Sequence, residues 1–139
     1  MNDYDKQWCK NRIEDLSKWP LAEPFKKPVD PEKDGAPNYF EKISSPMDIS
    51  TMRKKLNQSE YLTIESFMDD IYLMCQNAIE YNGENSMLAF IANDIRTWAE
   101  EQYANKATSS DEEWRKKLEN ILETLLKHVK NAPSSLFTN

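Results

Sequence analysis

An asparagine stands at the polar end of a helical apolar face in this chain. The apolar residues before it are spaced by four, three and four positions: Phe67, Ile71, Met74 and Ala78. Asn82 follows four positions later, so on a helix it lies only about 40° further round the same face. A buried carboxamide without a partner costs about 1–3 kcal/mol, so it requires backbone, water or a ligand. Asn82 is therefore either an amide that binds a ligand or, together with Gly83, an ordinary helix C-terminus.

Catalytic chemistry has little support among the other polar residues. Adjacent carboxylates occur at Asp69-Asp70 and at Glu112-Glu113, but neighbouring residues on a helix point in different directions and do not form an acid–base pair. His128 is the only histidine, and it stands in a Lys-rich helix end without a partner for catalysis. We therefore expect that the chain is not an enzyme.

The charge and cysteine content exclude further classes. Lys and Arg number 18 against 24 Asp and Glu, so the net charge is −6 and the basic footprint of a nucleic-acid-binding protein is missing. An acidic surface favours basic partners such as Lys-rich peptides. Cys9 and Cys75 lack zinc-binding spacing, so we expect two free, buried thiols and no metal or cofactor. The absence of a long apolar run or a secretion signal indicates an intracellular protein without a membrane partner.

Helical periodicity and capping residues predict the elements that position Asn82. The expected helices cover residues 3–18, 49–57, 64–82, 87–103 and 111–130. Asp48 and Thr63 are the expected N-caps of the second and third helices, and Gly83 ends the third. Ser110 and Glu113 form a predicted capping box for the last helix. The chain is therefore expected to be all-α.

The connector over residues 19–47 holds six of the seven prolines. It also carries many apolar side chains, which a disordered linker does not need. A loop of this length in a small domain is usually functional. We therefore expect a packed loop, with a short helical turn from residue 38 to residue 43.

Several motifs around Asn82 occur in a fixed order along the chain. They are Pro28-Val29-Asp30-Pro31, Pro37-Asn38-Tyr39-Phe40, the run from Ile43 to Met52, and Asn77-Ala78-Ile79-Glu80-Tyr81-Asn82. Their order and spacing resemble the bromodomain family over about residues 4–103. Within the family, the run from Phe25 to Pro31 and the additional C-terminal helix look most like bromodomains of AAA-type ATPase-linked chromatin proteins.

The resemblance implies a left-handed, up-and-down four-helix bundle with a long first inter-helix loop and an extra C-terminal helix. Residues 1–107 would form an acetyl-lysine-binding bundle, with the pocket between the 19–47 loop and the 83–86 turn. Residues 108–139 would be a helical extension packed on or beside the bundle. The alternative is a helical protein–protein interaction or dimerisation module with a vestigial pocket, in which the last helix pairs with another chain.

The resemblance also implies roles for individual residues. Asn82 would donate to the acetyl carbonyl, and Tyr39 would hold a water that bridges to the same oxygen. The other pocket positions match an apolar wall, a shelf, a gatekeeper and two lining residues: Val29, Phe25 with Pro24, Leu88, and Tyr81 with Ala78. Asn77 is expected to fasten the loop rather than to contact ligand.

The shelf departs from the family pattern. The usual Trp-Pro-Phe is replaced by Glu23-Pro24-Phe25, and Trp19-Pro20-Leu21 four residues earlier is the other candidate for this position. The implied function is a non-catalytic reader of acetylated lysine on histone tail peptides. We expect a nuclear monomer that does not bind nucleic acid directly.

Overall fold

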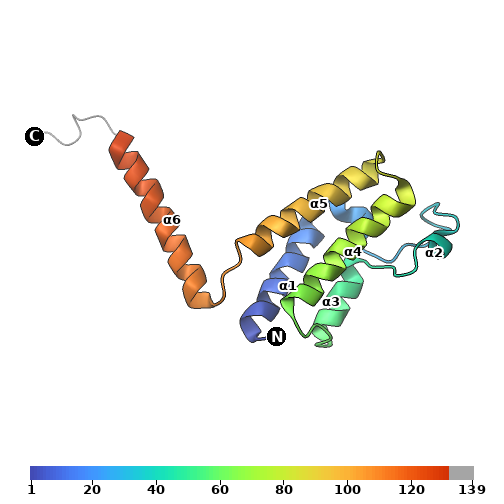
Figure 1. The fold of residues 1–139 in the computed structure, drawn as a ribbon, viewed down its shortest axis with the longest axis horizontal. Coiled ribbons are helices and arrows are strands. Elements are labelled where there is room, and N and C mark those ends of the chain that lie inside the picture. Colours follow the sequence, from blue (N-terminus) through green and yellow to red (C-terminus); the bar gives the residue numbers. More distant parts are fainter. Residues whose placement is uncertain (132–139) are drawn as a thin grey trace, which may run out of the picture. The chain divides into compact units, whose positions relative to one another are not determined.

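The computed structural model describes residues 1–131, which contain helices and loops but no strand. The four long helices of its first part run alternately up and down: α1 (Asp3–Lys18), α3 (Ile49–Asn57), α4 (Ile64–Asn82) and α5 (Met87–Ala104) (Figure 1). Helix α4 packs against α5, and α1 packs against α3 and α4. The predicted all-α four-helix bundle is confirmed, with the helix ends within one residue of their expected positions.

Local capping signals set the helix starts in the bundle. The Asp48 carboxylate accepts from the Thr51 amide at 3.1 Å and from the hydroxyls of Ser50 and Thr51. Thr63 accepts from the Ser66 amide at 3.1 Å, which begins α4. Both predicted caps are confirmed, and each satisfies backbone donors that the first turn of a helix leaves free.

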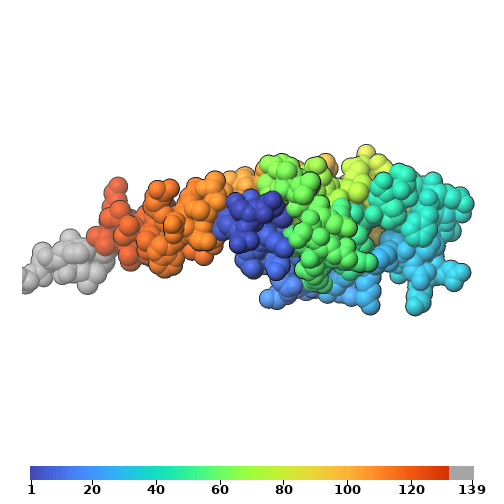
Figure 2. Space-filling model, turned by 90° about the horizontal axis from the view of Figure 1, so that it is seen from below, coloured from blue at the N-terminus to red at the C-terminus, as the bar shows by residue number. Residues whose placement is uncertain are grey.

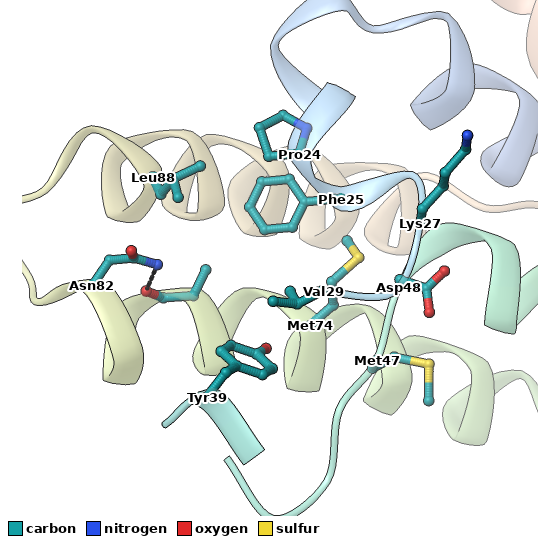
Figure 3. Close-up of a pocket in the computed structure, with 11 residues that line it drawn as sticks. Pro24, Phe25, Lys27, Val29, Tyr39, Met47, Asp48, Met74, Asn82 and Leu88 are labelled. Atoms are coloured by element: carbon teal, nitrogen blue, oxygen red, sulfur yellow. Dashed lines mark hydrogen bonds between the residues drawn. The ribbon is translucent and has the colours of Figure 1, made fainter. Parts of the chain in front are cut away.

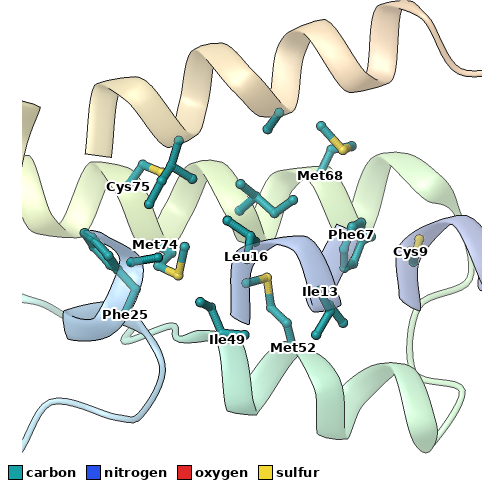
Figure 4. Close-up of a cluster of buried hydrophobic side chains, with 14 of the residues drawn as sticks. Cys9, Ile13, Leu16, Phe25, Ile49, Met52, Phe67, Met68, Met74 and Cys75 are labelled. Atoms are coloured by element: carbon teal, nitrogen blue, oxygen red, sulfur yellow. The ribbon is translucent and has the colours of Figure 1, made fainter. Parts of the chain in front are cut away.

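The bundle encloses one apolar core, to which the 3₁₀ helix η1 (Pro20–Phe25) contributes (Figure 4). Its largest fully buried side chains include Ile13, Leu16, Met52 and Phe67. Burial of such side chains contributes about 1.5–3 kcal/mol each. The predicted apolar face of α4 is buried along its length, and Cys9 and Cys75 are free thiols inside the core, as expected.

The connector between α1 and α3 folds over the bundle end that also carries the α4–α5 turn (Figures 1 and 2). Its short helix α2 (Tyr39–Lys42) confirms the predicted helical turn. The Asn77 side chain donates to the Ser45 carbonyl at 2.8 Å, and the Tyr81 hydroxyl donates to the Pro37 carbonyl at 2.8 Å. The connector is therefore a packed loop fastened to α4, and the expected role of Asn77 is confirmed.

The connector also has an apolar cluster of its own. Ala36, Tyr39 and Ile43 are buried together, with Val29 and Tyr81 packed against them. This group, called the loop cluster below, is separate from the core of the bundle. The loop cluster fixes the position of the Tyr39 ring relative to α4.

The chain divides into two units, Met1–Asn105 and a second that begins at Lys106 and contains α6 (Ser110–Asn131). The cap of α6 is Ser109, which accepts from the Glu112 amide at 3.2 Å, so the prediction of Ser110 was wrong by one residue. The reason is that the Glu112 carboxylate accepts hydrogen bonds from both the amide and the hydroxyl of Thr108, the residue before Ser109.

Helix α6 is amphipathic, and its large apolar side chains are each at least 42% exposed: Trp114, Leu118, Ile121, Leu122, Leu125, Leu126 and Val129. One helix cannot cover its own apolar face. The predicted packing of the extension on or beside the bundle stays a prediction, and its residues 132–139 lie outside the described part. No helix within residues 1–131 combines the length and apolarity needed to cross a membrane.

Candidate functional site

A pocket of about 50 Å³ opens where the connector meets α4 and the first turn of α5. Its lining residues come from η1, the connector, the start of α3, α4 and α5 (Figure 3): Pro24, Phe25, Lys27, Val29, Tyr39, Met47, Asp48, Met74, Ala78, Asn82 and Leu88. This volume holds a few water molecules or a small chemical group. Side chains up to 64 positions apart in sequence, from Pro24 to Leu88, therefore meet at one site.

The residues singled out from the sequence converge on this pocket. Those that line it are Pro24, Phe25, Val29, Tyr39, Ala78, Asn82 and Leu88. Tyr81 is not among the lining residues, because one helical step from Asn82 turns its side chain by about 100° toward the connector. The centroid of its ring lies 5.0 Å from that of Tyr39, so Tyr81 packs against a lining residue without lining the pocket itself. The parts that these eight residues play in binding stay predictions.

Asn82 lies at the mouth of the pocket and is exposed, so its amide does not carry the cost expected for a buried one. Its Nδ2 donates to the Ala78 carbonyl at 3.0 Å, one turn earlier in α4. A carboxamide has two N–H groups and an oxygen, so one donor and the acceptor remain available to a ligand. Gly83 follows with φ of +90° and ends the helix. The amide is thus suited both to binding and to closing the last turn.

Tyr39 supplies a second polar group, from the connector. Its side chain is buried, and its ring packs edge-to-face against Phe40 at 5.5 Å as well as against Tyr81. Burial, and then the neighbouring Tyr81, raise the pKa of Tyr39 above its ordinary value. The hydroxyl therefore stays neutral at physiological pH, where it can both donate and accept a hydrogen bond.

The shelf beside the pocket is formed by Pro24 and Phe25 at the end of η1. The alternative residue Trp19 packs edge-to-face on Trp98 at 5.9 Å and does not line the pocket. Glu23 forms an ion pair with Lys26 at 2.6 Å and is exposed. The apolar part of the shelf is therefore present, while its outer edge carries a carboxylate in place of an indole.

Four lining residues were not predicted from the sequence as pocket residues: Lys27, Met47, Asp48 and Met74. Met74 could have been predicted as a pocket residue, because it lies eight positions before Asn82, or two spacings of four, on the same face of α4. Asp48 was interpreted as a helix cap only, and it both caps α3 and borders the pocket. Lys27 carries no pattern that marks it, because its place depends on how the connector folds.

The chemistry of the pocket is that of a binding site. Its walls are largely apolar, with Asn82 and Tyr39 as the groups able to orient a ligand, which is typical of small-molecule and side-chain pockets. The Asp48 carboxylate is held by its three donors from α3. Within residues 1–131, no group of three or more His, Cys, Asp or Glu side chains could hold a metal ion. The arrangement suits a neutral polar group that ends in a small apolar part.

Comparison with known proteins agrees with this geometry. The family model described as Bromodomain matches residues 9–94, which include most of the bundle and every residue that lines the pocket. The chain belongs to the bromodomain family. The closer likeness to bromodomains of AAA-type ATPase-linked proteins stays a prediction.

Relatives of this bromodomain include proteins of an amoeba and of two yeasts. An ankyrin repeat, bromo and BTB domain-containing protein of Dictyostelium discoideum is 40% identical over 86 residues, 62% of this chain and 11% of that protein. The SWR1 complex bromodomain subunit bdf1 of Schizosaccharomyces pombe is 32% identical over 141 residues, 99% of this chain and 22% of the relative. Bromodomain-containing factor 1 of Saccharomyces cerevisiae is 40% identical over 84 residues, 60% of this chain and 12% of the relative. The chain thus spans less than a quarter of these proteins.

Proposed function

We propose that this bromodomain is a reader of acetylated lysine in chromatin. The observation that carries the proposal is the Asn82 amide at the mouth of an apolar pocket, with a donor and an acceptor free for a ligand. The Asn82 Nδ2 donates to the acetyl carbonyl, and the Tyr39 hydroxyl holds a water that bridges to the same oxygen. Val29 and Ala78 contact the acetyl methyl group, with Phe25 and Pro24 as the shelf and Leu88 as the gatekeeper.

The pocket distinguishes acetylated from unmodified lysine through charge. Acetylation removes the positive charge and adds a flat amide with an apolar end. An ammonium group would lose its hydration in this largely apolar site, which is costly, and the Asp48 carboxylate that borders the pocket already accepts from three donors in α3. The acetylated side chain avoids this cost, and its carbonyl pairs with Asn82.

The ligand class that we propose is acetylated histone tail peptides, bound by a nuclear monomer without catalysis and without direct contact to nucleic acid or membrane. The relative named as a subunit of the SWR1 complex supports a role in chromatin. The net charge of −6 favours a basic partner. One buried side chain contributes little area, so we expect dissociation constants in the micromolar to millimolar range.

Isothermal titration calorimetry with acetylated and unmodified histone tail peptides tests the proposal. We expect binding to the acetylated peptides alone, and about tenfold or greater loss of affinity in the Asn82→Ala variant. Its melting temperature should stay close to that of the parent chain. Asn85→Ala is the matched control, since Asn85 is exposed in the neighbouring turn and does not line the pocket, and its affinity should be unchanged.

Two outcomes would contradict the proposal. Equal or absent binding of acetylated and unmodified peptides would favour the second candidate function, an interaction or dimerisation module, for which the exposed apolar face of α6 is the specific observation. A large loss of stability in Asn82→Ala with retained affinity would instead indicate that Asn82 serves only to close α4.

A further inference from the structure

Asn82 is the only asparagine of the chain that a glycine follows. An asparagine amide is thermolabile, because the backbone nitrogen of the next residue can attack its side-chain carbonyl carbon. Glycine has no side chain that hinders this approach. Asn82 and Gly83 are both exposed, and a methyl group placed on Gly83 would meet no atom within 4 Å. The requirements for this reaction therefore meet at the amide that lies at the mouth of the pocket.

The reaction at this peptide bond is a deamidation. The Gly83 nitrogen gives its proton to base and attacks Cγ of Asn82 with its electron pair, so an N–Cγ bond forms and the Cγ–Nδ2 bond breaks. Nδ2 takes up a proton and leaves as ammonia, and a cyclic imide remains. Water then adds to one of the two imide carbonyl carbons and opens the ring, which gives aspartate or isoaspartate at position 82. Nothing is oxidised or reduced, and solvent water is the co-reactant.

The last turn of α4 holds both reacting groups in hydrogen bonds. The Gly83 N–H donates to the Ile79 carbonyl at 2.8 Å, so it points back along the helix. The Asn82 Nδ2 donates to the Ala78 carbonyl at 3.0 Å (Figure 3). Beyond the glycine, the Ser86 hydroxyl donates to the Gly83 carbonyl at 2.7 Å. Ring closure therefore requires this turn to open, and the end of a helix opens at a lower free energy than the whole domain.

We propose that Asn82 is a deamidation site whose rate is set by opening of the last turn of α4, and that its conversion abolishes acetyl-lysine binding. The effect on binding rests on the function proposed above. An ionised carboxylate accepts hydrogen bonds but has no N–H to donate, so it repels an acetyl carbonyl. It also loses the bond to Ala78, because two acceptors then face each other. A bound ligand slows the reaction, since it engages the Asn82 amide while the turn is closed.

Incubation of the full chain at mildly alkaline pH, followed by peptide mass mapping, tests the site. We expect the amide NH₂ to be replaced by OH at Asn82, but not at Asn77, which is buried in the same helix, or at Asn85, which is exposed in the next turn. Unfolding in urea should speed the conversion about tenfold or more, because the turn is then open. An acetylated histone tail peptide at about ten times its Kd should slow the conversion about tenfold, because only the unbound chain reacts.

Three variants separate the opening of the turn from its effect on binding. Ser86→Ala removes the hydroxyl that holds the Gly83 carbonyl and caps α5, so it should speed the conversion about fivefold. Thr63→Ala is the matched control, since it removes a capping hydroxyl at the opposite end of α4, and it should leave the rate unchanged. Asn82→Asp carries the product side chain from the start and should bind the acetylated peptide about tenfold or more weakly than the parent chain.

An intact Asn82 in the folded chain, or equal conversion of Asn82 and Asn85, would overturn the site. Equal rates in the folded and urea-unfolded chains, or equal acceleration by Ser86→Ala and Thr63→Ala, would overturn control by the last turn of α4. Unchanged affinity in Asn82→Asp would overturn the effect on binding. If the unconverted chain binds no acetylated peptide, the proposed function itself fails, whereas the mass measurement still decides whether Asn82 is converted.

Discussion

At the scale of single residues, the thiol of Cys75 links stability to pH. Its side chain is fully buried in the core, and this burial raises the pKa of Cys75 to about 12, which the nearby Arg96 only partly offsets. In the unfolded chain the thiol ionises near its ordinary value of 9.0. Between about pH 9 and about pH 12 the unfolded state therefore binds fewer protons than the folded state, and stability falls as pH rises.

We expect the free energy of unfolding, measured by urea denaturation, to decrease from pH 8 to pH 11. Burial also raises the pKa of Tyr61, which hydrogen-bonds Asp70, so this tyrosine contributes in the same direction. Cys75→Ala should lower the free energy of unfolding at pH 8, because it leaves a cavity. Between pH 9 and pH 11, however, the free energy of unfolding of this variant should fall less than that of the parent chain. Parallel pH profiles for the two proteins would contradict the assignment to Cys75.

At the scale of elements, Gly83 decides where α4 ends and thus where Asn82 lies. Its φ of +90° and ψ of 152° belong to a region of backbone conformation used almost only by glycine. A methyl group at this position would meet no atom within 4 Å, so the cost of a substitution comes from the backbone alone.

Gly83→Ala should lower the free energy of unfolding by about 1–3 kcal/mol and weaken binding of acetylated peptides, because the last turn of α4 must shift to relieve the strain. Chemical denaturation and calorimetry measure the two effects. Gly35→Ala is the comparison, since it adds the same methyl group in equally open space at φ of +62° in the connector, far in sequence from Asn82. An unchanged affinity in Gly83→Ala would contradict the link between helix end and site.

The helix ends of this bromodomain could be predicted because residues close in sequence set them. Pro20 follows the end of α1, Asp48 and Thr63 accept from amides three positions later, and Gly83 stops α4. The error at α6 has the same local origin, because two serines stand side by side and the bond from Thr108 to Glu112 selects the first.

The pocket could be predicted only in part. Asn82, Met74 and Ala78 lie on one helical face, which periodicity reveals. Lys27 and Met47 lie 20 positions apart in the connector, and they border the same cavity only because the connector is folded by contacts with α4. Such long-range contacts leave no period in the sequence, so only the ordered family motifs indicated that the connector forms a wall of the site.

At the scale of the whole molecule, the first unit contains both the core and the pocket. Every residue of the main core lies between Trp8 and Ala99, and every pocket residue lies between Pro24 and Leu88. A chain that ends at Ala107 should therefore fold and bind acetylated peptides with unchanged affinity. Circular dichroism and calorimetry of the truncated and full chains check this, and loss of binding on truncation would contradict it.

Light scattering of the same two chains tests the expected monomer. The apolar face of α6 is the feature most able to pair two copies. We expect both chains to have the mass of a monomer. A dimer formed by the full chain and absent after truncation would show that α6 is an interface, and it would support the second candidate function.

The loop cluster has a consequence for how the protein is handled. Ala36, Tyr39 and Ile43 form a small cluster apart from the main core, and regions held by few apolar contacts open at a lower free energy than the whole domain. The connector includes only the short turns η1 and α2, so its opening removes little helix. A preparation can therefore keep its far-ultraviolet spectrum while the binding wall is unformed. Only the molecules whose connector is folded can then bind, so the apparent affinity falls in proportion to their fraction. A helicity measurement alone therefore does not show whether this site is formed.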